Sequence, residues 1–139
     1  MRLVLDTNIV FSGLLWNGAP SRLINLIIHE IIALFTSAEL LGELSDVLTR
    51  DKHQHLITRV GATPSSLLID YSDLCRIVNP APLPAPIAPD PDDDWVIATA
   101  LAAEADLIVT GDKPFLSVGA VGSIRIISVG DALAVIESV

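Results

Sequence analysis

Cysteine is nearly absent from this sequence: Cys75 is the only one among 139 residues. A lone cysteine cannot form an internal disulfide, and it cannot build a zinc site from paired cysteines. The first residues, MRLVLD, lack the apolar stretch of a secretion signal. We therefore expect a protein of the cytoplasm, where thiols stay reduced.

Basic residues are scarce as well. The chain has 8 Lys and Arg against 17 Asp and Glu, for a net charge of −9. A protein held on nucleic acid by bulk electrostatics needs many cations to neutralise phosphates, so this class is disfavoured. An enzyme that contacts nucleic acid through bound metal cations remains compatible with the charge. No apolar run reaches the ~18 uninterrupted residues of a membrane span, and we expect no membrane association.

What the sequence does have is an alternation of short apolar runs and helical patterns, which fits one domain over residues 1–139. This alternation predicts an α/β fold with a mainly parallel sheet covered by helices on both faces. Thr36 and Glu39 have the spacing of a helix capping box. Residues 79–91, with six prolines, predict an extended connection. The expected strands are 2–5, 33–37, 75–78, 106–112 and 124–129, and the expected helices are 7–16, 20–30, 38–50, 64–74, 95–105 and 131–138.

Two aspartates follow predicted strands directly. Asp6 comes after LVL, and Asp112 comes after LIVTG. Ligands of parallel sheets gather outside the carboxyl ends of the strands, so both side chains are expected at one rim. Glu43 lies just beyond the apolar stripe of its predicted helix. It is either a surface glutamate or the acid of that helix best placed at the edge of a cleft.

A run of aspartates precedes the predicted helix 95–105. Asp92 or Asp93 can cap this helix, and any of the acids there stabilises the positive end of the helix dipole. Capping needs only one residue and leaves the last acid of the run, Asp94, without a structural role. Because the helix is apolar round most of its circumference, we expect Asp94 to point along it toward the strand ends.

The four segments VLDTNIVFSGLL, TSAELLGELSDVL, DPDDDWVIATALAAEAD and LIVTGDKPF, in this order, resemble the PIN-domain nucleases, particularly the toxin-like proteins of bacterial toxin–antitoxin systems. The resemblance covers nearly the whole chain and implies a three-layer α/β/α sandwich. It also implies an endoribonuclease that depends on Mg²⁺ or Mn²⁺, which are ions that prefer carboxylate oxygens. The acids implied as catalytic and metal-binding residues are Asp6, Glu43, Asp94 and Asp112.

Four further residues are candidates for supporting roles around these acids. By the same resemblance, Asn8 and Thr110 fall on polar positions that help to orient the acids, and Asp93 is an open candidate for the metal site. Lys113 follows Asp112 and is a candidate for a phosphate contact. The implied partners are an RNA substrate and an antitoxin protein, and we expect a homo-oligomer.

Two other functions remain to be weighed. A phosphatase of the haloacid-dehalogenase type also uses an aspartate at a strand end, but it needs a second acid two residues later, where this chain has Asn8. A non-catalytic PIN-like module for binding or dimerisation would be favoured by a missing acid, and none is missing. The resemblance therefore favours the nuclease.

Overall fold

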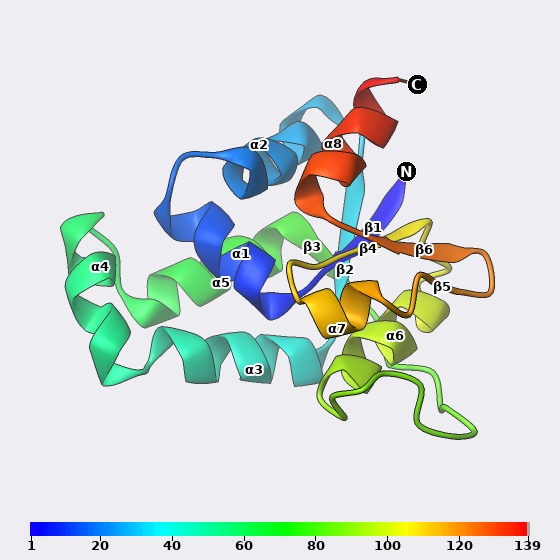
Figure 1. Cartoon of the computed structure of the whole chain (residues 1–139). Coiled ribbons are helices and arrows are strands. Elements are labelled where there is room, and N and C mark those ends of the chain that lie inside the picture. The colour runs from blue at the N-terminus through cyan, green and yellow to red at the C-terminus, as the bar shows by residue number, and fades with distance from the viewer. Residues whose placement is uncertain (139) are drawn as a thin grey trace.

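The computed structural model describes residues 1–138 and contains a single six-stranded sheet with the order β3-β2-β1-β4-β6-β5 (Figure 1). Neighbouring strands are parallel except for β5, which pairs antiparallel with β6. The predicted mainly parallel sheet is therefore confirmed. The strands are β1 (Arg2–Leu5), β2 (Ala33–Thr36), β3 (Cys75–Ile77), β4 (Leu107–Val109), β5 (Ala120–Val121) and β6 (Ile124–Ile127).

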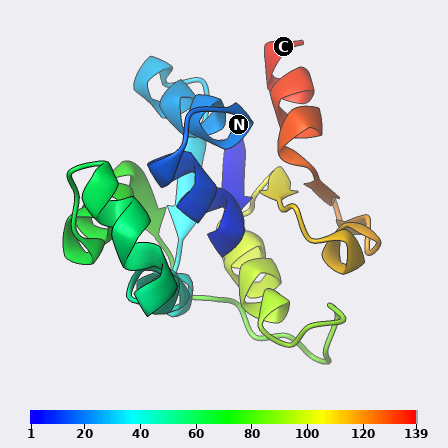
Figure 2. The ribbon, with the colours of Figure 1, turned by 60° about the vertical axis from the view of Figure 1, so that its left-hand side comes forward.

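Helices cover both faces of this sheet, which confirms the predicted α/β/α layering (Figures 1 and 2). Residues of α1, α2, α5 and α8 pack on one face, and residues of α6 and α7 pack on the other. The helices are α1 (Thr7–Leu15), α2 (Ala19–Asn25), η1 (Leu26–His29), α3 (Ala38–Leu48), η2 (Asp51–His53), α4 (Gln54–Arg59), α5 (Pro64–Leu74), α6 (Asp93–Ala102), α7 (Lys113–Leu116) and α8 (Val129–Glu137).

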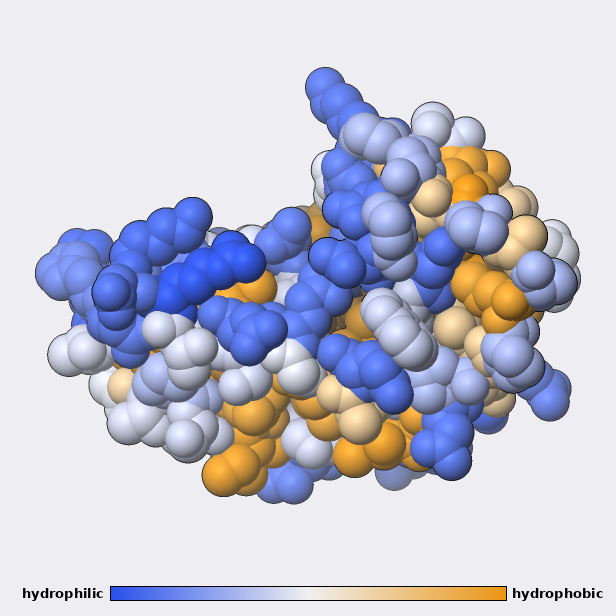
Figure 3. Space-filling model, turned by 90° about the horizontal axis from the view of Figure 1, so that it is seen from below, coloured by the Kyte–Doolittle hydropathy of each residue, from blue (hydrophilic) through white to orange (hydrophobic). Residues whose placement is uncertain are grey.

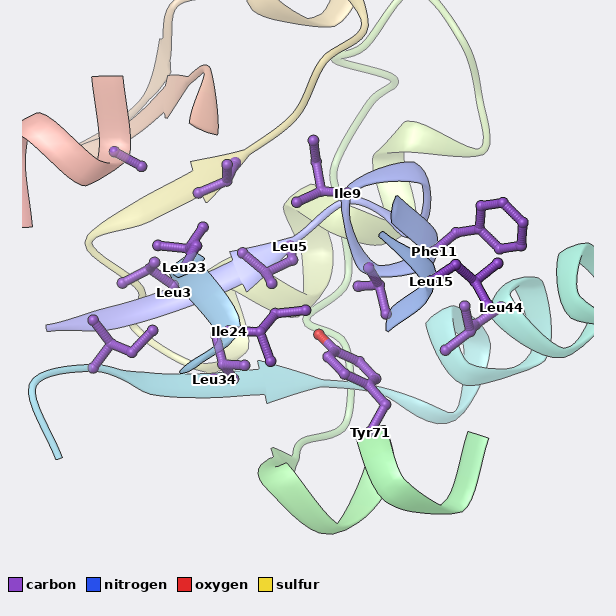
Figure 4. Close-up of a cluster of buried hydrophobic side chains, with 14 of the residues drawn as sticks. Leu3, Leu5, Ile9, Phe11, Leu15, Leu23, Ile24, Leu34, Leu44 and Tyr71 are labelled. Atoms are coloured by element: carbon purple, nitrogen blue, oxygen red, sulfur yellow. The ribbon is translucent and has the colours of Figure 1, made fainter. Parts of the chain in front are cut away.

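The core consists of two apolar clusters, one on each face of the sheet. Alternate residues of a strand point to opposite faces, so Leu3 and Leu5 join the first cluster, whereas Val4 joins the second. Figure 4 shows the first cluster, in which Leu3, Leu5 and Leu34 of the strands face side chains of α1, α2, α3 and α5. Burial on both faces explains why the strands read as continuous apolar runs.

The position of β1 determines where a site can form. From β1 the chain continues to β2 and β3 on one side, and it returns through β4 and β6 on the other. The strand order thus reverses between β1 and β4, and this switch point is where parallel sheets bind ligands. The residues that follow β1 and β4 are therefore the ones best placed for a site.

Several local expectations were wrong. Ser37, rather than Thr36, caps α3, because its hydroxyl accepts a hydrogen bond from the Leu40 amide at 3.4 Å. The polar link after α3 contains η2 and α4, which have no clear apolar stripe in the sequence. The short elements α7 and β5 were also not predicted.

The proline-rich stretch forms no helix or strand between Ile77 and Asp93, as expected. Throughout residues 1–138, no helix has the length and hydropathy to cross a membrane.

Candidate active site

Asp6 lies at the carboxyl end of β1 and begins α1 as its N-cap. Its side chain is buried, with 5% of its surface exposed. One carboxylate oxygen accepts a hydrogen bond from the Thr7 amide at 2.8 Å, and the other accepts one from the Thr110 hydroxyl at 2.7 Å. A buried carboxylate needs such partners because an unsatisfied one would be costly. The structure therefore holds Asp6 in a single, fixed orientation at the sheet switch point.

Thr110 connects two of the predicted acids. It follows β4 and is fully buried, and its amide donates to the Ile127 carbonyl of β6. Its hydroxyl donates to Asp6 and accepts a hydrogen bond from the Asp112 amide at 3.1 Å. One hydroxyl thus fixes the position of the backbone that follows β4 relative to Asp6 at the end of β1.

A cleft of about 550 Å³ opens at this rim of the sheet. Figure 3 looks onto the rim, and hydrophilic residues, drawn blue, cross the middle of that face. Three of the four acids predicted to form the site line this cleft, and three further aspartates join them. The lining residues are Asp6, Asn8, Ile9, Ser12, Glu43, Asp90, Asp92, Asp93, Gly111 and Asp112.

The structure differs from the sequence expectation at the acid on α6. Asp93, the first residue of the helix, lines the acidic cleft, whereas Asp94 does not. The Oδ1 atom of Asp94 instead accepts hydrogen bonds from the amides of Ile87 and Ala88, at 3.2 and 2.8 Å. Residues one position apart on a helix point about 100° apart, so the two aspartates face different sides. The assignment of Asp94 to the cleft is thereby corrected to Asp93.

Burial and mutual repulsion raise the pKa values of three acids in the cleft. Loss of solvent is the main cause for each of them. The pKa of Asp93 is raised to about 7, with further contributions from Asp6, Asp90, Asp112 and Glu43. The pKa values of Asp6 and Glu43 are also raised, and hydrogen bonds from threonine side chains partly offset both shifts. The cleft is thus a place where negative charge is costly unless a cation offsets it.

The helices that carry Glu43 and Asp93 are joined by a buried contact. The hydroxyls of Ser37, the N-cap of α3, and Thr99 of α6 lie 2.8 Å apart. Both residues are fully buried. This contact sets α6 against the start of α3, and so it helps to place an acid from each helix at the same cleft.

Asn8 and Lys113, the other polar residues predicted for the site, differ in their positions. Asn8 is exposed and belongs to its lining, whereas Lys113 is exposed at the start of α7 and does not. The bases Arg50, Lys52 and Arg59 are exposed on η2 and α4 or next to them.

The residues of the cleft fit a hard divalent cation in kind. Carboxylate oxygens are the ligands that Mg²⁺ and Mn²⁺ prefer. Within residues 1–138, however, no three Asp, Glu, His or Cys side chains lie close enough together to hold a metal ion as they stand. Mg²⁺ usually keeps several waters and binds one or two carboxylates directly. A wide acidic cleft suits that mode better than a closed protein cage.

Comparison with known proteins identifies the family. Residues 2–114 match the PIN domain family, and the chain belongs to it. PIN domains are generally nucleases and typically use divalent metals. Asp6, Glu43, Asp93 and Asp112 all lie within the matched region, which ends two residues after Asp112.

The chain is also similar to a relative and to a solved structure. The chain is 30% identical over 118 residues to the uncharacterized protein MJ1680 of Methanocaldococcus jannaschii, covering 84% of this chain and 74% of the relative. The crystal structure of PAE2754 from Pyrobaculum aerophilum superposes with a TM-score of 0.58 at 14% identity, covering 100% of this chain and 91% of the other. The second likeness supports the fold alone.

The sequence reasoning missed Asp90 and gave Asp92 only a role at the helix terminus. Both residues line the cleft. The Asp90 side chain accepts a hydrogen bond from the Asp92 amide at 2.9 Å, which closes a tight turn before α6. The dipeptide Asp90-Pro91 was the available signal, because Asp-Pro favours the start of a turn and an aspartate side chain can accept from the amide two residues on.

Proposed function

We propose that this protein is a metal-dependent endoribonuclease that hydrolyses RNA phosphodiester bonds. The observation that carries the proposal is the cleft at the sheet switch point, where five carboxylates surround a sixth, the buried and hydrogen-bonded Asp6. Such a concentration of acids disfavours direct binding of a phosphodiester and favours a bound divalent cation. Membership of the PIN domain family supports the nuclease class.

Asp6, Glu43, Asp93 and Asp112 are the proposed carboxylates of the site, with Asp93 in place of Asp94. Divalent cations bound there would supply an activated water and stabilise charge on the phosphoryl oxygens. The Thr110 hydroxyl donates to the Asp6 carboxylate and accepts from the Asp112 amide, and so it holds the two residues close together. Asn8 lines the cleft and is available to hydrogen-bond a substrate oxygen. Lys113 lies one residue beyond Asp112 and is the nearest base in sequence for a phosphate.

We further propose that the protein is the toxin of a toxin–antitoxin pair and acts as a homo-oligomer. An enzyme that cuts RNA in its own cell needs restraint, and a partner with basic residues would complement the acidic cleft. The net charge of −9 supports a basic inhibitory segment. Co-expression with the neighbouring gene should relieve any growth defect and yield a complex on purification.

Incubation with structured and unstructured RNAs, in Mn²⁺, Mg²⁺ or chelator, tests the activity. We expect cleavage with metal only, and its loss in Asp6→Asn, because a neutral amide keeps the shape but removes the charge that holds the cation. Removal of one member of a unit-acting site usually costs orders of magnitude. Asp70→Asn is a matched control, since Asp70 is exposed on α5. Retention of more than about a tenth of wild-type cleavage by Asp6→Asn contradicts the assignment. Metal binding without cleavage of any RNA favours a binding module.

A further inference from the structure

A second hollow lies beside the acidic cleft, between α6 and the proline-rich segment that extends below the helix in Figure 1. Its volume is about 570 Å³. Its lining includes five prolines of the segment from Pro80 to Pro91, together with Leu83, Ala98, Asp94 and Trp95. We call this hollow the proline groove.

The proline groove and the acidic cleft share one wall, which is the stretch from Asp90 to Trp95. Asp90, Asp92 and Asp93 line the cleft, whereas Pro91, Asp94 and Trp95 line the groove. The groove is also held to α6, since Asp94 accepts from the amides of Ile87 and Ala88, and the Ala81 amide donates to the Ala98 carbonyl at 3.0 Å. A polymeric ligand bound across the cleft would therefore reach the proline groove next.

The groove wall has the chemistry of a nucleobase site. Trp95 is 47% exposed, although it lies in the first turn of a helix whose following residues, Val96 to Ala100, are buried. An indole face is a stacking platform for a base of a single strand. Asp94 uses Oδ1 for both of its hydrogen bonds within the described chain, which leaves Oδ2 to accept from a ligand.

From this arrangement we propose that the proline groove binds a nucleobase next to the scissile phosphodiester, stacked on Trp95, with Asp94 Oδ2 accepting from an exocyclic amino group on the Watson–Crick edge of the base. This inference rests on the proposed ribonuclease function. Carboxylates recognise exocyclic amino groups such as that of cytosine. The site should therefore favour cytosine, adenine or guanine over uracil at this position.

Other occupants fit the wall less well. No lysine or arginine occurs among the described residues that line the groove, so a phosphate group has no cation there. A peptide that added as a strand would need a run of backbone donors, and the five prolines that interrupt this wall have none. A stacked base requires neither and explains the exposed indole beside a carboxylate.

Affinity for short single-stranded RNA in chelator, where the proposed cleavage cannot occur, tests the inference. Labelled pentanucleotides of cytidine, adenosine or uridine are titrated with wild type, Trp95→Leu and Trp95→Phe. Trp16→Leu is the matched control, because Trp16 is 48% exposed but lies at the end of α1, outside the groove. We expect Trp95→Leu to weaken binding about tenfold or more, and Trp95→Phe to retain most of it, because stacking rather than apolar area is lost.

The preference for bases provides a second readout. Asp94→Asn keeps an amide oxygen for the loop and places a donor where Oδ2 was, so we expect the preference to shift toward uridine. Equal affinity of wild type and Trp95→Leu, or no binding by wild type, overturns the proposal. A change of oligomeric state in Trp95→Leu with unchanged RNA affinity makes the groove a subunit contact instead. If wild type binds through Trp95 but cleaves no RNA with Mn²⁺, the ribonuclease function fails and the base site stands.

Discussion

The Thr110 hydroxyl donates a 2.7 Å hydrogen bond to Oδ2 of Asp6, which joins two buried side chains that are 104 residues apart in the chain. The contact spans the parallel strands β1 and β4 at the point where the strand order reverses. The same hydroxyl accepts from the Asp112 amide. The geometry of the acidic cleft therefore depends on one neutral side chain.

Thr110→Val should lower both stability and metal affinity. The substitution keeps the shape but leaves the Asp6 carboxylate without one hydrogen bond, which costs about 1–3 kcal/mol for a buried group. Burial already raises the pKa of Asp6, and the hydrogen bond from Thr110 partly offsets this rise in the wild type. The pKa of Asp6 should therefore rise further in the variant, which lacks that hydrogen bond. Thermal melts and Mn²⁺ titrations check both effects. Thr110→Ser retains the hydroxyl and should restore the metal affinity, and an equal loss in the two variants would contradict this role.

The neighbouring aspartates of α6 should behave differently. Asp93→Asn should abolish metal-dependent RNA cleavage, because Asp93 lines the cleft. Asp94→Asn should retain cleavage of mixed-sequence RNA, because its amide oxygen can still accept from Ile87 and Ala88. The two variants are compared by their rates of cleavage of the same RNA with Mn²⁺. Circular dichroism checks that both variants are folded. An inactive Asp94→Asn beside an active Asp93→Asn would return the assignment to the sequence-based one.

The contrast between these acids shows how far the sequence could predict the site. Asp6 and Asp112 were placed correctly at one rim because they follow apolar strands, and a parallel sheet brings strand ends to one edge. Glu43 was placed by the apolar stripe of α3, which the structure buries through Leu40, Leu44, Val47 and Leu48.

Asp93 and Asp94 could not be separated in this way. Their direction depends on the residue at which α6 begins, and the run of acids offers several equivalent caps. The helix starts at Asp93, and Asp92 in the N-cap position makes no capping hydrogen bond with its side chain. The direction of Asp94 is fixed by a tertiary contact, in which its carboxylate accepts hydrogen bonds from the amides of Ile87 and Ala88. A contact with a proline-rich loop leaves no periodic pattern in the sequence.

The metal-free protein should lose stability as the pH rises from about 4 to about 7. The pKa of Asp93 is about 7 in the fold against 3.8 when unperturbed. A carboxyl group with a raised pKa favours the folded state at low pH, and that contribution is lost as the pH rises through the folded value. Because Asp93 is half-exposed and its charge is partly screened, we expect about 1–2 kcal/mol. Asp6 and Glu43 shift in the same direction.

Denaturant unfolding in chelator at several pH values measures this dependence. Asp93→Asn should flatten the fall between pH 4 and 7, because the variant has no proton to lose at that position. Asp70→Asn, an exposed acid on α5, should leave it unchanged. Parallel pH profiles for wild type and Asp93→Asn would show that the carboxyl group is not perturbed.

Asp112→Asn tests the metal site without any substrate. Asp112 lines the cleft, and its charge contributes to the raised pKa values of Asp6 and Asp93. Neutralising it relieves repulsion where no cation is bound, so the variant should melt higher than wild type in chelator. With millimolar Mn²⁺, wild type gains RT ln(1 + [L]/Kd), about 2.7 kcal/mol at a hundredfold excess over Kd.

The variant should gain much less, because it has lost one carboxylate and holds the cation more weakly. The difference between the melting temperatures of Asp112→Asn and wild type should therefore be smaller in Mn²⁺ than in chelator, or change sign. A general effect of surface charge would not reverse the order in this way, and Asp70→Asn, which removes one exposed charge, controls for it. Equal shifts of wild type and Asp112→Asn on addition of Mn²⁺ would remove Asp112 from the metal site and leave Asp6, Glu43 and Asp93 as its carboxylates.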